Sequence, residues 1–469
     1  MIPNQWYPIL RTEDVKRDAP TGVKRLGEEL VLWRDVGGKL VCQSARCPHK
    51  GANLSDGRLV GNSIACPYHG FRYDTSGACR LIPALGTQGR IPASMRIDTY
   101  EVREKYGLVW LWWGEQREKL PDIELPHELA EHPRPYETIT WSRPVHYTRY
   151  IESLLEFYHV TFVHRDHWAN IIDYTFMYGS WRKLWTDGRE RYIAANKIVN
   201  HRVDVDGTII RSTFDQCEEG DPSNIWHFDL IYQAPCMTHV RQGLLEVTTW
   251  LTPIDEENTQ AIMRLWEYPL LKRMVPIKPL RPWILKASLQ MEKYVQDQQD
   301  NDIMARQEPK VSERGVNKLI APDEMNAKYL QMRDRLKAEA RAESEAREAA
   351  RAREAAADER QEAPAHGSSS GNGSGSGNGS GRAGRPEAAA EDERGGTDER
   401  GGDHRELPAQ GRPPRLRPGG ADDVEERHPG GDDHVLGAGR RPVQALSERG
   451  QVGHLGSGDG RMRILDVHP

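Results

Sequence analysis

Two short Cys/His pairs constrain this chain more than any other feature of its sequence. The first pair is Cys47-Pro48-His49 and the second is Cys66-Pro67-Tyr68-His69, so each supplies one cysteine and one histidine. Two thiolates and two imidazoles are ligands that iron–sulfur clusters and zinc ions both accept. The pattern therefore predicts a metal centre near the N-terminus, held between two loops.

The way the ligands are shared between the loops separates these two kinds of centre. In a Rieske [2Fe–2S] cluster two histidines replace two cysteines on one iron, and each loop supplies one ligand of each type. A structural zinc site also accepts two cysteines and two histidines, but its knuckles usually pair like with like. The mixed pairs favour a one-electron iron–sulfur carrier, with a zinc-binding interaction protein as the alternative.

The residues around the pairs resemble the two ligand loops of Rieske oxygenases. They read Cys47-Pro-His-Lys-Gly-Ala52 and Cys66-Pro-Tyr-His-Gly-Phe-Arg-Tyr-Asp74. High-potential respiratory Rieske proteins carry an extra cysteine in each loop, joined as a disulfide, where this chain has Ala52 and Tyr68. The resemblance therefore implies the lower-potential oxygenase or ferredoxin type. The cluster ligands that it implies are Cys47, His49, Cys66 and His69.

Length, charge and cysteine content limit the class of protein further. The 469 residues leave room for two or three domains, and the net charge of −6 argues against a partner such as nucleic acid. The first residues lack the basic and apolar segments of a signal peptide. No apolar run approaches the roughly 18 residues of a membrane span. We therefore expect a soluble cytoplasmic protein that binds no membrane.

The four cysteines outside the pairs are too few and too scattered for a disulfide framework. Among them, Cys42 and Cys79 are expected to pack beside the cluster loops. Residues 20–114 read as short strands separated by turns, with a hairpin signal at Val36-Gly-Gly38. The pattern predicts an all-β domain over residues 1–118, with the metal loops at its tip.

The character of the chain changes after a Pro-rich junction. Helical periodicity begins the stretch 145–168, and the spacing of apolar residues predicts a helix over 282–307, interrupted near Asp300. Strand-like segments at 244–251 and 260–266 predict an antiparallel hairpin between these helices. The sequence therefore indicates an α+β catalytic domain over residues 119–340.

The last part of the chain has a different composition. No aromatic residue follows Tyr329, and residues 367–381 contain only Gly, Ser and Asn. The Ala/Glu/Arg-rich segment 331–361 can form a solvated helix with i,i+4 ion pairs. The remainder cannot bury enough apolar surface to offset its ordering entropy. We expect residues 341–469 to be largely disordered, either as a native appendage or as an out-of-frame extension.

A second metal site is needed if the cluster is to drive oxidation, and His159 and His164 are candidates for it. On a regular helix two residues five apart point about 140° away from each other. The pair can bind one ion only if the helix ends or bulges between them. By spacing alone they are ordinary core or surface residues. The rival histidines are His146, His167 and His201.

An acidic run supplies the candidate carboxylate for a two-histidine, one-carboxylate iron site. The run covers residues 296–307, and its ordinary reading is a solvated helix face. Resemblance to the Rieske oxygenases selects Asp300, because Gln307 and Pro309 follow it in the register of the family's ligand aspartate. Asp297 and Asp302 remain alternatives.

The resemblance covers residues 5–310 and implies further roles. His159 and His164 match the two iron-binding histidines of the family. Glu156 stands where the family has an aspartate that bridges cluster and iron sites in electron transfer. Either Glu152 or Ser153 stands where the family has an asparagine. Both departures concern residues around the iron and not its ligands.

The implied protein is the terminal oxygenase α subunit of a Rieske non-haem iron oxygenase, with a helix-grip (START-like) catalytic domain. It would receive electrons from an NAD(P)H-dependent reductase, directly or through a ferredoxin. In a head-to-tail homotrimer the cluster of one subunit would serve the mononuclear Fe(II) of its neighbour. Oxygen from O₂ would enter a small organic substrate, expected to be aromatic or cyclic.

The type of oxidation is open between two reactions. The absence of a fused reductase favours single-subunit monooxygenases, which hydroxylate or O-demethylate, over cis-dihydroxylating ring dioxygenases. A Rieske electron-transfer protein without oxygenase activity is the alternative from another class, and it would not need the His159/His164/Asp300 set. The sequence does not identify the substrate.

Overall fold

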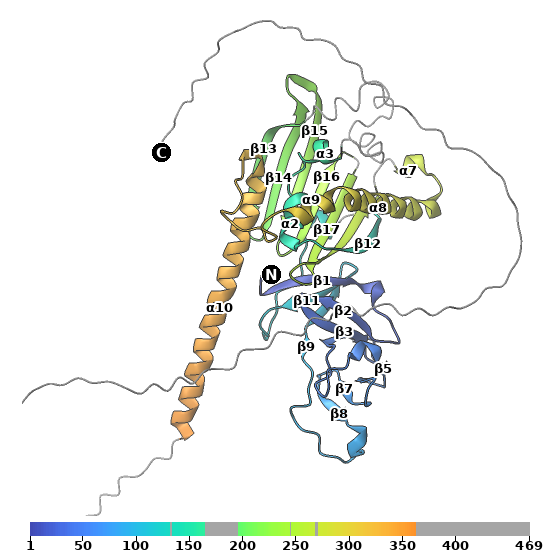
Figure 1. Ribbon diagram of the computed structural model, residues 1–469, viewed down its shortest axis with the longest axis vertical. Helices are drawn as coiled ribbons and strands as arrows, with labels where there is room; N and C mark the ends of the chain where they lie inside the picture. The colour runs from blue at the N-terminus through green and yellow to red at the C-terminus, as the bar shows by residue number, and fades with distance from the viewer. Residues whose placement is uncertain (132–133, 165–195, 244, 268–270, 363–469) are drawn as a thin grey trace, which may run out of the picture. The chain divides into compact units, whose positions relative to one another are not determined.

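The computed structural model describes residues 1–131, 134–164, 196–243, 245–267 and 271–362 (Figure 1). Its strands form four sheets: three small ones before residue 119 and one of seven strands after residue 135. Every strand pairing among them is antiparallel. Together with the packed helices, this architecture confirms the α+β fold class.

The N-terminal domain contains eleven short strands in sheets of order β1-β11-β10, β2-β3-β4-β9 and β5-β6-β7-β8. Their bounds are β1 (Gln5–Arg11), β2 (Thr21–Arg25), β3 (Glu28–Arg34), β4 (Leu40–Ser44), β5 (Arg58–Leu59), β6 (Ser63–Ala65), β7 (Arg72–Asp74), β8 (Cys79–Leu81), β9 (Thr99–Tyr100), β10 (Val102–Lys105) and β11 (Leu108–Trp113). The hairpin expected around residues 36–38 joins β3 to β4, where Gly38 adopts φ 81°. Such a turn favours glycine because it has no Cβ.

The domain that the sequence predicts to be catalytic is built on the seven-stranded sheet of order β12-β18-β17-β16-β15-β14-β13; it is called the catalytic domain below. Its strands are β12 (Tyr136–Arg143), β13 (Lys197–Asp206), β14 (Ile209–Glu218), β15 (Asp221–Gln233), β16 (Met237–Gln242), β17 (Leu245–Pro253) and β18 (Thr259–Trp266). The expected hairpin is β17–β18, in which Val247 pairs with Leu265.

Both faces of this sheet are covered, which explains why β17 and β18 are almost wholly buried. Because side chains alternate between faces, Val247 and Leu251 enter one core, whereas Trp250 enters another. The first core lies under helices of the catalytic domain. The second contains Trp6 and Trp112 of the N-terminal domain.

The helices are α1 (His127–Ala130), α2 (Tyr147–Leu154), α3 (Val160–Val163), α7 (Leu271–Met274), α8 (Arg281–Gln298), α9 (Asp300–Arg306) and α10 (Glu324–Glu362). Single 3₁₀ turns lie at Thr12–Asp14, Leu54–Asp56, Pro83–Leu85, Lys278–Leu280 and Ala321–Asp323. In Figure 1, α2, α8 and α9 lie across one face of the large sheet, where α8 contacts β12 and β18 and α2 contacts β17. None of the described helices is long and apolar enough to cross a membrane.

Three helical expectations have different outcomes. The break near Asp300 is confirmed, since α8 ends at Gln298 and α9 begins at Asp300. The stretch 145–168 is not one helix but holds α2 and the single-turn α3, while residues 165–168 lie outside the described residues. The boundary expected at residue 341 falls inside a helix, because α10 runs from Glu324 to Glu362.

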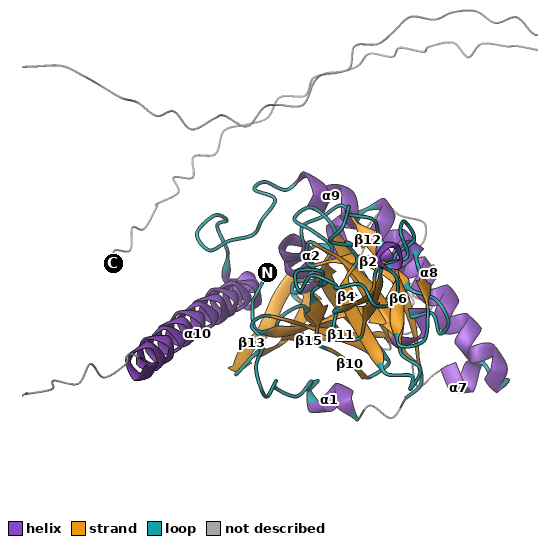
Figure 2. Cartoon of the chain, turned by 90° about the horizontal axis from the view of Figure 1, so that it is seen from below, coloured by secondary structure: helices purple, strands orange, loops and turns teal. Residues whose placement is uncertain are grey.

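The contacts of α10 explain why it continues past residue 341. Its first turns bury Met325, Tyr329 and Leu336 in the large core, and Figure 2 shows it beside the β13 edge of the sheet, opposite α8. Further along, Glu343 accepts a hydrogen bond from Asn4 of the N-terminal domain (3.0 Å). The expectation of disorder for residues 363–469 lies outside the described residues.

Candidate metal centres

The two Cys/His loops fold into the same turn. The backbone N–H of Gly51 donates to the carbonyl of Cys47 (2.8 Å), and that of Gly70 donates to the carbonyl of Cys66 (3.0 Å). Both glycines have positive φ, 74° and 71°, a conformation that side chains with a Cβ rarely adopt. The repeated C-P-x-x-G spacing therefore shapes two matching loops, one after β4 and one after β6.

The four candidate ligand side chains differ in burial: the two cysteines are buried, and the two histidines are partly exposed. Cys47 and Cys66 are buried, with 1% and 4% of their surface exposed. The rings of His49 and His69 lie side by side and half-buried, with 4.7 Å between their centroids. A Rieske cluster needs this division, because its inner iron takes the thiolates and its outer iron takes the imidazoles.

Two observations test the fit of a cluster to these residues. Burial raises the pKa of the Cys47 thiol, so its thiolate form needs a bound cation. The Tyr73 hydroxyl lies 3.2 Å from Sγ of Cys47, where it can donate a hydrogen bond to a metal-bound thiolate. Such a hydrogen bond from outside the ligand set stabilises the thiolate form that a metal centre requires.

The other two cysteines near the loops are placed differently. Cys79 packs into the core cluster that contains Cys47 and Cys66, as expected. Cys42 points instead into the large core that the N-terminal and catalytic domains share.

The second candidate centre is formed by His159, His164 and Asp300. Their ligand atoms all lie within 4.8 Å of one another, and Nε2 of His164 lies 3.4 Å from Oδ1 of Asp300. His159 precedes the single turn of α3 and His164 follows it. The helix end that the five-residue spacing requires is that of α3, which stops at Val163 before His164, whereas α2 has already ended at Leu154.

In each of the two histidines, the ring nitrogen Nδ1 is hydrogen-bonded to another side chain. Nδ1 of His159 lies 2.6 Å from Oε1 of Glu156, and Nδ1 of His164 lies 2.6 Å from Oε1 of Gln299. Both partners are acceptors, so each Nδ1 carries the proton and each Nε2 lone pair is left for a metal. Two imidazoles and one carboxylate on one side of an ion are the donor set of non-haem Fe(II) oxygenases.

The carboxylates around His159 also affect its protonation. Burial disfavours the charged imidazole, but the Glu156 and Asp300 carboxylates outweigh it and raise the pKa of His159 to about 9. Without a cation the site would therefore hold a proton on His159, which a metal ion replaces.

The rival residues from the sequence have other surroundings. Asp302 is exposed and faces Arg306, and Asp297 pairs with Arg143 and Lys293. The remaining rivals are His146, which caps α2; His201, which lies beside Ser212; and His167, which lies outside the described residues. None of the described rivals has a ligand atom in the His159/His164/Asp300 group.

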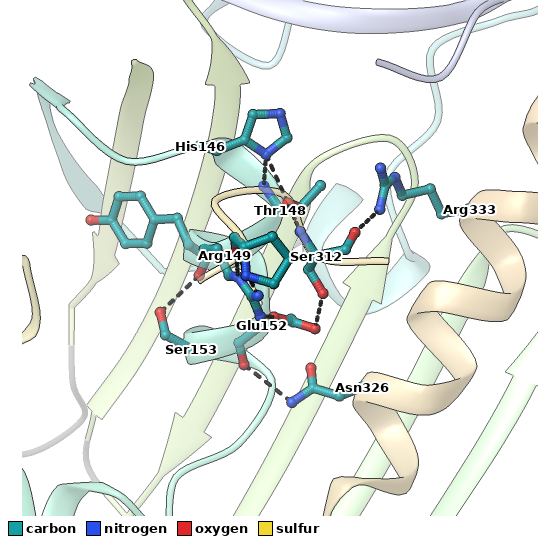
Figure 3. A network of polar contacts seen from close by, with 10 residues as sticks. His146, Thr148, Arg149, Glu152, Ser153, Ser312, Asn326 and Arg333 are labelled. Atoms are coloured by element: carbon teal, nitrogen blue, oxygen red, sulfur yellow. Dashed lines mark hydrogen bonds and ion pairs between the residues drawn. The ribbon is translucent and has the colours of Figure 1, made fainter. Parts of the chain in front are cut away.

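The side chains of Glu152 and Ser153 hold α2 in place (Figure 3). The Glu152 carboxylate accepts hydrogen bonds from Arg149 (2.9 Å) and from the Ser312 hydroxyl. The Ser153 hydroxyl donates to the carbonyl of Tyr150 within the same helix (2.8 Å). Sequence position alone did not reveal this anchoring role.

The anchor continues from α2 to the segment before α10. Arg149 donates two hydrogen bonds to the carbonyl of Pro309 (3.0 and 2.7 Å), and Arg333 of α10 donates to the carbonyl of Ser312. Arg149, Ser312 and Arg333 are all buried. The segment that leads to the metal site is therefore fixed by charged hydrogen bonds to two later elements (Figure 3).

Two cavities meet at the metal site. Both are lined by His159 and Asp300. The inner cavity, between α8 and the sheet, is mostly apolar and also contains Glu292 and Gln296. The outer cleft is polar and contains Glu152, Glu156 and Gln307. An ion at the site would thus be reachable from an apolar pocket on one side and a polar cleft on the other.

Glu292, Gln296 and Gln299 are site residues that the sequence analysis missed. With Asp300 they recur at intervals of four, three and one residues, which places them on one face of α8 and its continuation. That spacing was a usable signal, but polar residues on one helix face usually contact solvent.

Comparisons with known proteins agree with these observations. Residues 5–101 match the Rieske [2Fe-2S] domain family. The chain is 34% identical over 169 residues to protein TIC 55, chloroplastic, of Pisum sativum, covering 35% of this chain and 30% of that protein. It is 39% identical over 113 residues to aminopyrrolnitrin oxygenase PrnD of Pseudomonas fluorescens, covering 23% of this chain and 31% of that protein.

A solved structure extends the comparison beyond the first domain. Dicamba monooxygenase bound to 3,6-dichlorosalicylic acid aligns with 72% of this chain and 98% of its own, with a TM-score of 0.52 and 19% identity. At that identity the likeness shows the fold, which agrees from the cluster domain through the catalytic sheet.

The matched domain and its loops identify residues 5–101 as a Rieske [2Fe–2S] domain. The chain is similar to the oxygenase PrnD over 113 residues, and its fold is similar to that of dicamba monooxygenase. The chain covers only about a third of the two curated relatives named above. The activity, substrate and partners of the whole protein are therefore matters of proposal.

Proposed function

We propose that this protein is the terminal oxygenase component of a Rieske oxygenase system. The observation that carries the proposal is the group His159, His164 and Asp300, whose ligand atoms lie within 4.8 Å of one another in a chain that also has the Rieske loops. A protein that only transfers electrons has no use for a second site of this composition. We assign residues 1–118 to the cluster domain and 119–340 to the catalytic domain.

Each side chain has a distinct task in this function. Cys47, His49, Cys66 and His69 hold the cluster, and the His159/His164/Asp300 group holds one Fe(II). Fe(II) bound by two histidines and one carboxylate keeps open positions in which O₂ can bind. Glu156 and Gln299 orient the two imidazoles through Nδ1. The apolar inner cavity holds the substrate and limits the access of water.

The outer cleft supports a function that needs more than one subunit. Its described lining residues fall between 149 and 163 and between 300 and 326, and none belongs to the chain's own cluster loops. Glu156 lies in this cleft and is bonded to His159. We infer that the cluster of a neighbouring subunit in a homotrimer docks there, with Glu156 as the bridge between histidines. A reductase that oxidises NAD(P)H, directly or through a ferredoxin, delivers the electrons.

Monooxygenation, as hydroxylation or oxidative demethylation, is the favoured reaction. Relatives include PrnD, named an oxygenase, and methylxanthine N1-demethylase NdmA of Pseudomonas putida, to which the chain is 38% identical over 111 residues. A dihydroxylating reaction is the second candidate. It is supported by a 28% identity over 160 residues to the 3-chlorobenzoate-3,4-dioxygenase oxygenase subunit of Comamonas testosteroni.

Iron content and colour test the proposal. The purified protein should contain about three iron atoms per chain, two in the cluster and one at the second site. His159→Ala should keep the cluster absorption, lose about one iron and abolish substrate-dependent O₂ uptake. Asp302→Asn, at an exposed carboxylate of the same acidic run, should change none of these. If His159→Ala retained turnover and all its iron, the oxygenase assignment would be wrong.

Substrate dependence gives a further check on the reaction. With a reductase and NADH present, O₂ uptake should be slow until a substrate is added, because turnover without substrate wastes reductant as peroxide. Equal uptake with and without substrate would contradict this part of the proposal.

A further inference from the structure

The inner cavity contains one acidic side chain that the metal site does not use. Glu292 lies on α8, eight residues before Asp300, and both side chains line the cavity. Glu292 is half-buried. Any account of the substrate must explain an acid at this place.

Hydrogen bonds fix the orientation of this carboxyl group. The Tyr150 hydroxyl donates to Oε1 of Gln296 (2.8 Å), so the amide nitrogen of Gln296 must point the other way. That nitrogen donates to Oε1 of Glu292 (2.9 Å). Tyr150 is fully buried on α2, which makes this arrangement rigid. One carboxyl oxygen is thereby occupied and the other is left for a ligand.

No described lysine or arginine neutralises Glu292. It takes part in no salt bridge among the described residues, and no lysine or arginine is among the described residues that line the cavity. Burial raises the pKa of its carboxyl group, while the Gln296 amide and nearby His164 act in the opposite direction. The apolar part of the lining consists of Leu154, Phe157, Val160, Leu245, Val247, Met263 and Val295.

These surroundings define the chemical groups that a ligand of this cavity needs. A carboxyl group in an apolar site costs free energy unless it is hydrogen-bonded or paired with an opposite charge. A ligand with a basic nitrogen satisfies the free oxygen, while its hydrocarbon part packs on the apolar lining. A ligand carboxylate would meet Glu292, which disfavours a further negative charge beside it.

We propose that Glu292 is a specificity-determining residue, which selects organic substrates that carry an amine or another basic nitrogen and rejects carboxylic acids. The inference rests on the proposed oxygenase function, since it takes the inner cavity to be the substrate pocket. It narrows that function to the oxidation of nitrogen bases. Gln296 and Tyr150 are positioning residues, because they act on the ligand only through the Glu292 carboxyl group.

Binding of matched probes to the full-length protein tests the inference. The probes are benzylamine, benzyl alcohol and benzoate, which share one ring and differ in charge. Isothermal titration calorimetry should show benzylamine binding at least about tenfold more tightly than benzoate, because a charge-assisted hydrogen bond is among the strongest polar contacts. Glu292→Gln should weaken benzylamine about tenfold and change benzyl alcohol by less than about threefold.

Further variants separate recognition from folding. Glu292→Asp keeps the charge and should retain a preference for benzylamine over benzoate, even if packing suffers. Asp302→Asn removes the same charge from an exposed site and should leave all three affinities unchanged. The inference is wrong if wild-type protein binds benzoate as tightly as benzylamine, if benzylamine does not bind at millimolar concentration, or if Glu292→Gln leaves the ratio unchanged.

Iron analysis of the same samples keeps the two proposals distinct. Protein with about three irons per chain but no preference for benzylamine would reject the role of Glu292 alone. Protein without the third iron that still prefers benzylamine through Glu292 would reject the oxygenase function, and the cavity would then be a binding site for amines.

Discussion

At the scale of single residues, the proposed second metal site depends on the hydrogen bonds that Nδ1 of each histidine makes. Glu156 holds Nδ1 of His159 and Gln299 holds Nδ1 of His164, at 2.6 Å in each case. Gln299 sits at the break between α8 and α9, next to the candidate ligand Asp300. One short segment thus supplies both a candidate ligand and the group that would orient another candidate ligand.

Removing the Gln299 amide should weaken metal binding without disturbing the cluster. Gln299→Leu leaves His164 free to rotate or change tautomer, so we expect Fe(II) affinity to fall by about 10- to 100-fold. Titration of the metal-depleted protein with Fe(II) measures this, and the cluster absorption should stay the same. Gln298→Leu, at an exposed neighbour, is the matched control. Equal affinities for the two variants would contradict the role of Gln299.

At the scale of elements, α2 is the segment that the rest of the site is attached to. Its N-terminus is capped by His146, whose Nδ1 accepts a hydrogen bond from the Thr148 backbone (3.3 Å). Its last turn is tied by Glu152 to Arg149 and to Ser312 (Figure 3). Contacts at both ends fix where the chain leaves the helix toward His159.

Breaking the network at Glu152 should destabilise the protein measurably. Glu152→Leu leaves the buried guanidinium of Arg149 without its carboxylate, which costs about 3 kcal/mol in comparable buried pairs. Urea unfolding measures this loss. Ser153→Ala, which removes only a hydrogen bond within α2, should cost less than about 1.5 kcal/mol. Similar losses for both variants would show that the network does not stabilise α2.

The cap of α2 should make stability sensitive to acid. Burial, followed by the positive charge of Arg333, lowers the pKa of His146 to about 4, and the α-amino group, Lys337 and Arg149 act in the same direction. The unfolded chain takes up a proton on this histidine near pH 6.5, so stability is lost as the pH falls from about 6.5 toward 4. Raising the pH above 6.5 should bring no further gain from His146.

His146→Asn isolates this contribution. Asparagine also caps helices well, so stability at pH 7 should change little. Between pH 6.5 and 4 the variant should lose less stability than the wild-type protein, as measured by urea unfolding at several pH values. His127→Asn, at an exposed histidine, is the control. Parallel pH profiles for the wild-type protein and His146→Asn would overturn the assignment.

At the scale of the whole molecule, the sequence predicted best those features that have the most distinctive motifs. The cluster loops were recognisable because Cys47-Pro-His and Cys66-Pro-Tyr-His combine rare residue types at fixed spacing, and their fold follows from two glycines. The His159/His164 pair was ambiguous, since its geometry depends on a helix break that periodicity does not specify. Asp300 was found by resemblance, and the structure places it beside both histidines.

Other site residues depend on contacts between distant segments, which one sequence does not reveal. Gln299 meets His164 across 135 positions, and Tyr150 meets Gln296 across 146. Glu152 was considered as a substitute for a residue near the iron, but its partner Ser312 belongs to the segment before α10. Pairings of this kind are set by packing of α2 and α8 on the sheet and become visible only in three dimensions.

The large core belongs to neither domain alone. It joins Tyr7 and Leu111 of the cluster domain to Met263 and Leu285 of the catalytic domain in one buried cluster. Two domains that share a hydrophobic core cannot unfold independently. Heating should therefore abolish the cluster absorption and release the mononuclear Fe(II) in a single transition. Two separate transitions in a calorimetric scan would show that the shared interior does not couple them. With such cooperative unfolding, the cluster and the mononuclear iron would be lost together and not one after the other.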